Sequence, residues 1–211
     1  TLTPTARYDL FSDFPGNRYL ALSVVGLGRG FVWQLLTYQF LHGGLLHLLL
    51  NCWAIYVFGR AIEEAMGWRR FLALFFGSGV IGGLFQALAG VLLNGAFAAP
   101  VVGASAGAFG LVAAFATLYP ERPLMLLLFF IIPVNMRAKF LLLFSALLAV
   151  FGILFPADNI AHAAHLGGIV TGIVFVRLAT RWRWHWPRVQ RRQRPSLRLL
   201  VKTPRRTSAG W

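Results

Sequence analysis

Four polar side chains lie in apolar segments of this chain, where polar groups are costly and usually serve function. Ser105 stands in VVGASAGAFG, His165 in AHLGG, and His47 and Asn51 in FLHGGLLHLLLN. A serine nucleophile, an imidazole base and hydrogen-bond donors for an oxyanion are the components of acyl transfer. The competing interpretation of the serine segment is helix packing, because glycine and alanine at such spacings are common where membrane helices touch.

The elements that must position these groups are membrane helices. The chain of 211 residues is 58% hydrophobic and only 12% charged, with a mean hydropathy of +0.67, whereas about a quarter of the residues of a soluble domain are charged. Several apolar runs approach the roughly 20 residues that cross a bilayer. We therefore expect an all-α, polytopic transmembrane helical bundle with five visible spans, near residues 39–59, 71–93, 101–119, 140–156 and 160–179.

Two further features of the apolar segments bear on the fold: a short apolar run and a single cysteine. The run PLMLLLFFIIPV, residues 123–134, has too few residues to cross a membrane, so we expect an interfacial or re-entrant segment there. The single cysteine, Cys52, lies inside an apolar run. It excludes a disulfide within the chain, and we expect it to be a small core residue rather than a nucleophile.

The basic residues indicate the orientation. Eleven of the twenty lie from Arg177 to the end, three lie in each of the loops 60–70 and 120–139, and the loops 94–100 and 157–159 contain none. The positive side faces the cytoplasm, so the C-terminus is cytoplasmic. The basic tail follows an apolar span directly, which favours anionic lipid headgroups as its partner over nucleic acid.

The charge pattern also divides the chain into three parts. We expect an external loop segment at 1–38, a transmembrane core at 39–180 and a basic cytoplasmic tail at 181–211. Because residues 1–38 contain no apolar run of spanning length, we expect a sixth span upstream of Thr1, which would place both ends of the chain inside.

The polar groups of the spans reach a similar depth from the outer side. At 1.5 Å per residue, Ser105, His165 and His47 lie about 6, 8 and 12 Å into their spans, and Asn51 follows His47 by one helical turn. Small residues at Ala161, Gly168 and Gly172 share the face of His165, and such faces allow close helix contact. We therefore expect the helix of His165 to contact the helix of Ser105.

A second histidine, His162, competes with His165 for the role of base. His162 is nearer the surface and is expected to pair with Asp158, which leaves His165 as the preferred base. The six acidic residues lie in loops or at span ends, which argues against a proton relay and against an aspartyl intramembrane protease. The site is then a Ser–His dyad, with Phe109 as the ring on which His165 stacks. A metal site of His162, His165 and His47 is disfavoured because it has no acidic or thiolate ligand.

These motifs, taken together and in order, resemble those of the rhomboid intramembrane serine proteases. GASAGAFG resembles the nucleophile motif of that family, AHLGG its histidine motif, and FLHGGLLHLLLN the signature of its second span. The resemblance implies that Ser105 is the nucleophile and His165 the base. It also implies an oxyanion site formed by the Ser105 backbone N–H, His47 and Asn51, with Gly103 allowing close backbone approach.

The resemblance runs from about Tyr19 to Arg177 and includes AIEEAMG, in which Glu63 matches an acidic residue that ties the cytoplasmic end of the second span. One departure concerns the first loop. The family usually has Trp-Arg where this chain has Trp33-Gln34, which questions the anchoring of that loop by an arginine rather than the chemistry.

The implied function is cleavage of transmembrane segments of membrane proteins by an intramembrane serine endopeptidase without a cofactor. Eighteen arginines against two lysines fit a GC-rich bacterial genome, so we expect a bacterial cytoplasmic membrane, with the active site open to the outer side. The alternative is a rhomboid-like membrane binding protein or chaperone that lacks protease activity.

Overall fold

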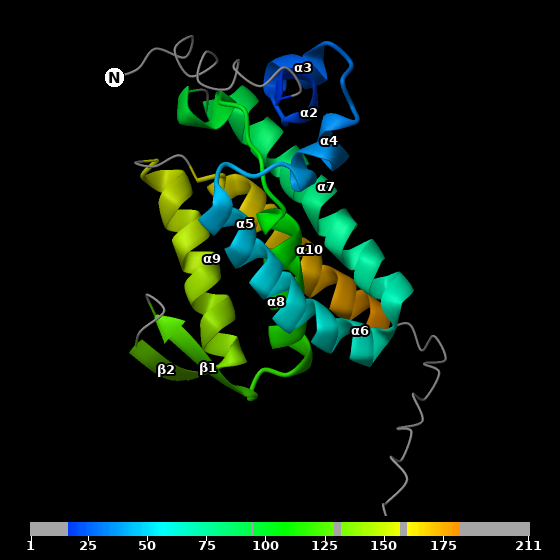
Figure 1. Cartoon of the computed structure of the whole chain (residues 1–211), viewed down its shortest axis with the longest axis vertical. Coiled ribbons are helices and arrows are strands. Elements are labelled where there is room, and N and C mark those ends of the chain that lie inside the picture. Colours follow the sequence, from blue (N-terminus) through cyan, green and yellow to red (C-terminus); the bar gives the residue numbers. More distant parts are fainter. Residues whose placement is uncertain (1–16, 94, 129–131, 157–159, 182–211) are drawn as a thin grey trace, which may run out of the picture.

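A computed structural model describes residues 17–93, 95–128, 132–156 and 160–181 (Figure 1). A lobe of short helices comes first, with α2 (Asn17–Leu20), α3 (Val24–Gly28), α4 (Gln34–Thr37) and the 3-10 turn η1 (Tyr38–Phe40). The remaining elements are α5 (Leu45–Ala54), η2 (Ile55–Gly59), α6 (Arg60–Met66), α7 (Trp68–Leu93), η3 (Gly95–Ala98), α8 (Ser105–Leu118), β1 (Pro123–Leu128), β2 (Ile132–Arg137), α9 (Ala138–Leu154) and α10 (His162–Arg181). The expected helical bundle is confirmed.

A helix occupies the centre of each of the five predicted spans. Among the described residues, three helices are long and apolar enough to cross a membrane: Leu45–Met66, Trp68–Leu93 and His162–Arg181. The helices α8 and α9 are apolar but shorter. Helix α8 is the central one, since ten of its 14 residues are buried by the surrounding helices and none is fully exposed. Its 14 residues extend only about 21 Å, a length that is sufficient because protein rather than lipid surrounds it.

The first long helix differs from the predicted span 39–59. It begins at Leu45, after a glycine pair, and continues through the π-helical segment η2 and α6 to Met66. Gly67 then turns the chain with φ +85°, a conformation that favours glycine, and its N–H donates to the Glu63 carbonyl. The expected loop at 60–70 is therefore mostly helix, and α7 starts at Trp68.

Two predictions made for α5 and α6 are wrong. Cys52 lies on the outer surface of α5, because this helix packs inward through its neighbour Asn51. The side chain of Glu63 is exposed and makes no hydrogen bond or ion pair within the described part of the chain. The cytoplasmic end of this helix is held instead by the backbone carbonyl of Glu63, which accepts the hydrogen bond from the Gly67 N–H.

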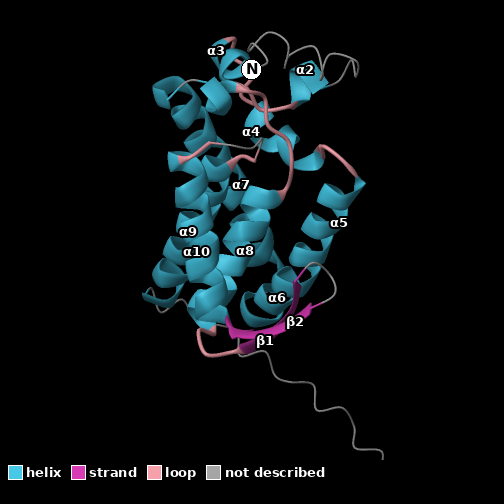
Figure 2. Cartoon of the chain, turned by 90° about the vertical axis from the view of Figure 1, so that its left-hand side faces the viewer, coloured by secondary structure: helices cyan, strands magenta, loops and turns pink. Residues whose placement is uncertain are grey.

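Residues 123–134 were expected to be an interfacial or re-entrant segment. The described residues there belong to two strands, β1 and β2, which pair in antiparallel fashion (Figure 2). The pairing runs from Pro123 with Arg137 to Leu128 with Ile132. At its base, Glu121 accepts hydrogen bonds from Arg137 at 2.8 Å and Lys139 at 2.5 Å, and the bond from Lys139 lowers the pKa of Glu121. A two-stranded sheet leaves both edges unpaired, which excludes it from hydrocarbon and agrees with a position outside the bilayer core.

The lobe of short helices lies at the opposite end of the bundle from the hairpin (Figure 2). Gln34 holds it together, since its side chain is fully buried, packs on Gly26 and accepts a hydrogen bond from the Ser23 N–H at 3.1 Å. Trp33 donates to the Tyr19 carbonyl at 2.9 Å. Gln34 stands where the rhomboid pattern usually has an arginine. This neutral side chain therefore anchors the loop in place of the arginine.

Glycines bring the three innermost helices into backbone contact. In α10, Gly168 lies against the Ala106 carbonyl of α8, and Gly172 lies against the Gly110 carbonyl. In α7, Gly82 lies beside the Ala164 carbonyl of α10. The small-residue face that carries His165 is thus the face that touches α8, as the spacing predicts.

Candidate active site

The helix that carries Ser105 begins at that residue. The predicted span started at 101, but Val101 pairs with Leu22 as an isolated β-bridge and Gly103 has φ +125°. The Gly103 N–H donates to the Tyr38 carbonyl at 2.9 Å. A positive φ interrupts a helix, so α8 starts two residues later and the first N–H groups of α8 have no partner within the helix. A serine at a helix N-terminus is next to donors that suit a negatively charged oxygen.

Ser105 and His165 are in direct contact. The Ser105 Oγ and the His165 Nε2 are 2.8 Å apart, although 60 residues separate them in the sequence. The centroid of the Phe109 ring lies 4.4 Å from that of the His165 ring, with the planes tilted by 38°. Phe109 comes from the same helix as Ser105, one turn further on, so the hydroxyl and the supporting ring approach the imidazole from one side.

His47 lies on the other side of Gly103. A Cβ added to Gly103 would be 2.6 Å from the Cε1 and 2.8 Å from the Nε2 of His47, and 3.7 Å from the Ser105 Oγ. Only a glycine therefore fits between the imidazole and the hydroxyl. His42 meets His47 edge to face at 5.1 Å, and burial lowers the pKa of His42, which favours a neutral ring in that contact.

Asn51 is one turn further along α5 than His47. Its side chain is 6% exposed, and its Nδ2 has no hydrogen-bond partner in the part of the chain that the structure describes. A buried amide donor without an acceptor is destabilising by about 1–3 kcal/mol. This cost is expected where the acceptor is a reacting group that arrives with a ligand.

His162 does not share the contact of His165 with the serine. It packs on Gly152 of α9, and its ring centroid lies 6.2 Å from that of His165 at an interplanar angle of 80°. Its predicted partner Asp158 lies outside the described residues. Within the described ranges, the structure gathers no group of three or more metal-binding side chains.

One polar residue near the site was missed. Gln86 of α7 is 4% exposed, accepts a hydrogen bond from the Ala164 N–H at 3.3 Å and donates one to the Phe97 carbonyl at 3.3 Å. Ala164 precedes His165 in the first turn of α10, where N–H groups have no intrahelical acceptor. Gln86 caps that turn from a neighbouring helix. The sequence did contain a signal for this role, because Gln86 is an uncharged amide in an otherwise apolar span.

Comparison with known proteins gives a consistent result. The model of the Rhomboid domain matches residues 29–182. Rhomboid protein 1, mitochondrial, of Saccharomyces cerevisiae is 30% identical over 64% of this chain and 38% of its own length. YdcA of Bacillus subtilis, described as a candidate rhomboid protease, is 38% identical over 41% of each chain. Rhomboid-like protease 2 of Toxoplasma gondii is 39% identical over 39% of this chain and 28% of its own length. The chain thus spans less than half the length of each of these relatives.

Proposed function

Since this chain belongs to the rhomboid family, we propose that it is an intramembrane serine endopeptidase that cleaves transmembrane segments of membrane proteins with Ser105 and His165. The observation that carries the proposal is the 2.8 Å separation between the Ser105 Oγ and the His165 Nε2. Protease names among its relatives support the same reaction class.

In the first half of the reaction, His165 takes the proton of Ser105 while the Oγ attacks the carbonyl carbon of the scissile peptide bond. The carbonyl oxygen becomes an oxyanion, for which the donors are the Ser105 N–H, His47 and Asn51. The C–N bond then breaks, His165 gives the proton to the departing amine, and the acyl group stays on Ser105. Gly103 leaves room for the oxygen between the serine and His47.

In the second half, His165 removes a proton from a water molecule, and the resulting hydroxide attacks the acyl carbon. The ester bond breaks, and the proton returns to the Oγ of Ser105. Phe109 orients the imidazole in both halves, in place of the carboxylate that orients the histidine of a triad.

The protein is an integral membrane protein, and we place it in a bacterial cytoplasmic membrane with its C-terminus in the cytoplasm. The orientation is supported by the basic residues near the hairpin end, among them Arg69, Arg137 and Lys139, which mark the cytoplasmic side. Ser105 begins α8 at the opposite end of that helix, so the site opens to the outer side. The partners are transmembrane protein substrates and, at the basic tail, anionic lipids.

A serine-reactive fluorophosphonate tests the proposal, together with cleavage of a transmembrane substrate in proteoliposomes. We expect the wild type to be labelled and to cleave, and Ser105→Ala and His165→Ala to do neither at a measurable rate. Labelling without cleavage of any transmembrane substrate would favour the non-proteolytic binding protein. A Ser105→Ala protein that cleaves at the wild-type rate would refute the proposed nucleophile.

A further inference from the structure

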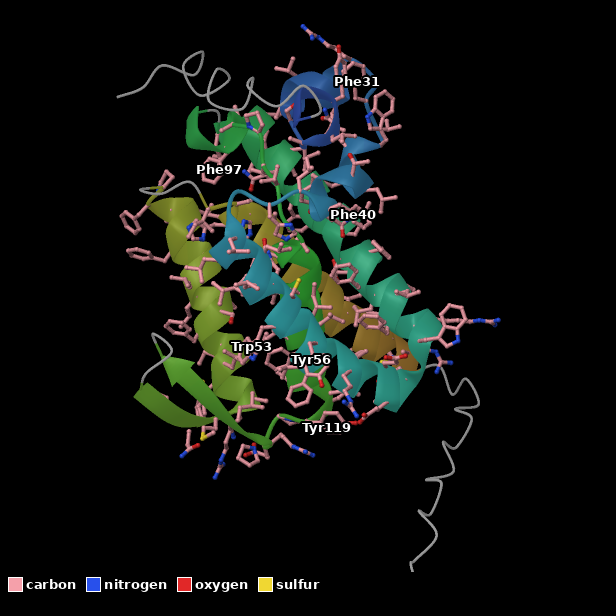
Figure 3. The ribbon with its side chains drawn as sticks, in the orientation of Figure 1. Phe31, Phe40, Trp53, Tyr56, Phe97 and Tyr119 are labelled. Carbon is pink, nitrogen blue, oxygen red and sulfur yellow. The ribbon has the colours of Figure 1, made fainter. Side chains whose placement is uncertain are left out.

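A cavity lies between α6 and the C-terminal end of α8, at the other end of α8 from Ser105. It has a volume of about 200 Å³. Ala61 and Ala65 form one wall, and their small side chains leave room opposite the rings of Phe115 and Tyr119. Figure 3 shows Tyr119 at the end of the molecule where α6 and α8 end. The cavity therefore combines aromatic and alanine side chains with the charged side chains of Glu64 and Arg122 close to an end of the bundle.

This end of the bundle lies at the level of lipid headgroups. Glu64 is two residues from the end of α6, and α8 ends at Leu118. Arg69 and Arg70 follow in the first turn of α7, and the charged base of the hairpin, with Glu121, Arg137 and Lys139, follows the C-terminal end of α8. Basic residues collect where membrane helices meet the cytoplasmic interface.

One cation and one anion line the opening. The guanidinium of Arg122 forms no ion pair within the described residues, while its backbone is fixed by a bond from its N–H to the Tyr119 carbonyl at 3.1 Å. Its own carbonyl accepts a hydrogen bond from the Ala138 N–H at 3.0 Å. Arg122 thus presents a charge from a fixed turn. Tyr119 is 39% exposed and lines the same cavity as Arg122.

The anion is Glu64, which currently binds Arg60 at 3.0 Å. Both side chains of that pair are about two thirds exposed, 68% and 64%. Such surface pairs contribute little to stability, so a competing cation can displace Arg60 at small cost. The same cavity is therefore lined by a phosphate-binding group, Arg122, and an ammonium-binding group, Glu64.

We infer that this cavity binds the headgroup of a primary-amine phospholipid, such as phosphatidylethanolamine. Arg122 and the Tyr119 hydroxyl bind the phosphate, and Glu64 accepts hydrogen bonds from the ammonium group. A choline headgroup has no N–H to donate to Glu64, and a glycerol headgroup has no cation for it. The acyl chains lie outside the cavity, along the exposed apolar side of the π-helical segment η2, which includes Tyr56 and Val57.

Native mass spectrometry of delipidated protein, titrated with single phospholipids, tests this site. We expect phosphatidylethanolamine to bind more tightly than phosphatidylcholine or phosphatidylglycerol with the same acyl chains. Arg122→Gln should weaken that binding about tenfold, the loss expected for one charge-assisted contact. Glu64→Gln should remove the preference for the ethanolamine headgroup over choline.

Arg69→Gln is the matched control, because Arg69 lies at the same end over the Trp68 ring and does not line the cavity. Thermal melting of each variant in detergent checks that it is folded. Equal affinities for the three lipids would overturn the inference, as would equal effects of Arg122→Gln and Arg69→Gln. Soluble glycerophosphoethanolamine binding as tightly as the lipid would overturn the assignment to a lipid and indicate a free phosphoester.

Discussion

Replacing Gly168 by alanine tests whether the approach of α10 to α8 sets the geometry of the proposed dyad. The added Cβ would lie 2.9 Å from the carbonyl carbon and 3.2 Å from the Cα of Ala106, and closer still to the carbonyl oxygen. Ordinary carbon–carbon contacts are about 3.5–4.0 Å, so the two helices must separate by about 1 Å. Neither partner can relieve this contact by rotating a side chain, because the neighbouring atoms belong to the backbone.

A separation of this size acts directly on catalysis. His165 is less than one turn from Gly168, and its Nε2 is 2.8 Å from the Ser105 Oγ. A further 1 Å removes that hydrogen bond, and misplacement by 1 Å can cost about 100-fold in rate. We therefore expect Gly168→Ala to lower kcat for a transmembrane substrate about 100-fold and to slow fluorophosphonate labelling by a similar factor.

The control is Gly77→Ala in α7, where a Cβ would meet nothing within 4 Å. This variant should keep the wild-type rate, which separates the local contact from a general effect of losing a membrane glycine. Circular dichroism should show the same helix content for both variants. A folded Gly168→Ala protein with the labelling and cleavage rates of the wild type would refute the argument from helix separation.

Three further predictions concern other polar groups. His47→Ala and Asn51→Ala should each lower single-turnover cleavage by about 10²–10³-fold if they are oxyanion donors, whereas Leu49→Ala on the outer face of the same helix should not. Gln86→Leu removes the cap on the first turn of α10 and should lower kcat about 5- to 10-fold, equivalent to about 1 kcal/mol, with little change in KM. Gln34→Ala leaves a buried backbone N–H without its acceptor and should destabilise the lobe of short helices by about 1–3 kcal/mol, measured by hydrogen exchange at residues 20–37; unchanged exchange there would contradict its anchoring role.

The bundle and the meeting of the polar groups could be predicted from the sequence because both depend on periodic features. Hydropathy located the centres of the five helices. Spacing placed Gly168 and Gly172 on the face of His165, and the structure brings that face against α8. Depth counted along the helices placed Ser105 and His165 at one level, and the structure gives a contact between them.

The start of the serine helix could not be predicted in the same way. The sequence is apolar from Val101 onward without a break. Gly103 nevertheless adopts a positive φ, which prevents a helix from continuing through it. That conformation depends on the Tyr38 carbonyl, which accepts the Gly103 N–H from a lobe distant in sequence. The consequence is chemical, because it puts Ser105 at the N-terminus of its helix rather than one turn inside.

Other differences also arose from tertiary contacts. The run at 123–134 is as apolar as the membrane-spanning helices, so hydropathy does not distinguish a strand from a helix there. Only the pairing of β1 with β2 shows that its described residues are strands. The outward position of Cys52 follows from which side of α5 faces α8. Gln34 replaces a charged residue of the family pattern, and its anchoring role became visible only through its bond from Ser23.

Comparison of wild type with Ser105→Ala in proteoliposomes tests the central claim most directly. The measurement is mass spectrometry of the fragments of a transmembrane substrate over time, with fluorophosphonate labelling of the same samples. The account predicts a cut within or beside the substrate's transmembrane segment by the wild type, and no fragments and no label with Ser105→Ala. Fragments that appear at the same rate in both samples would contradict it.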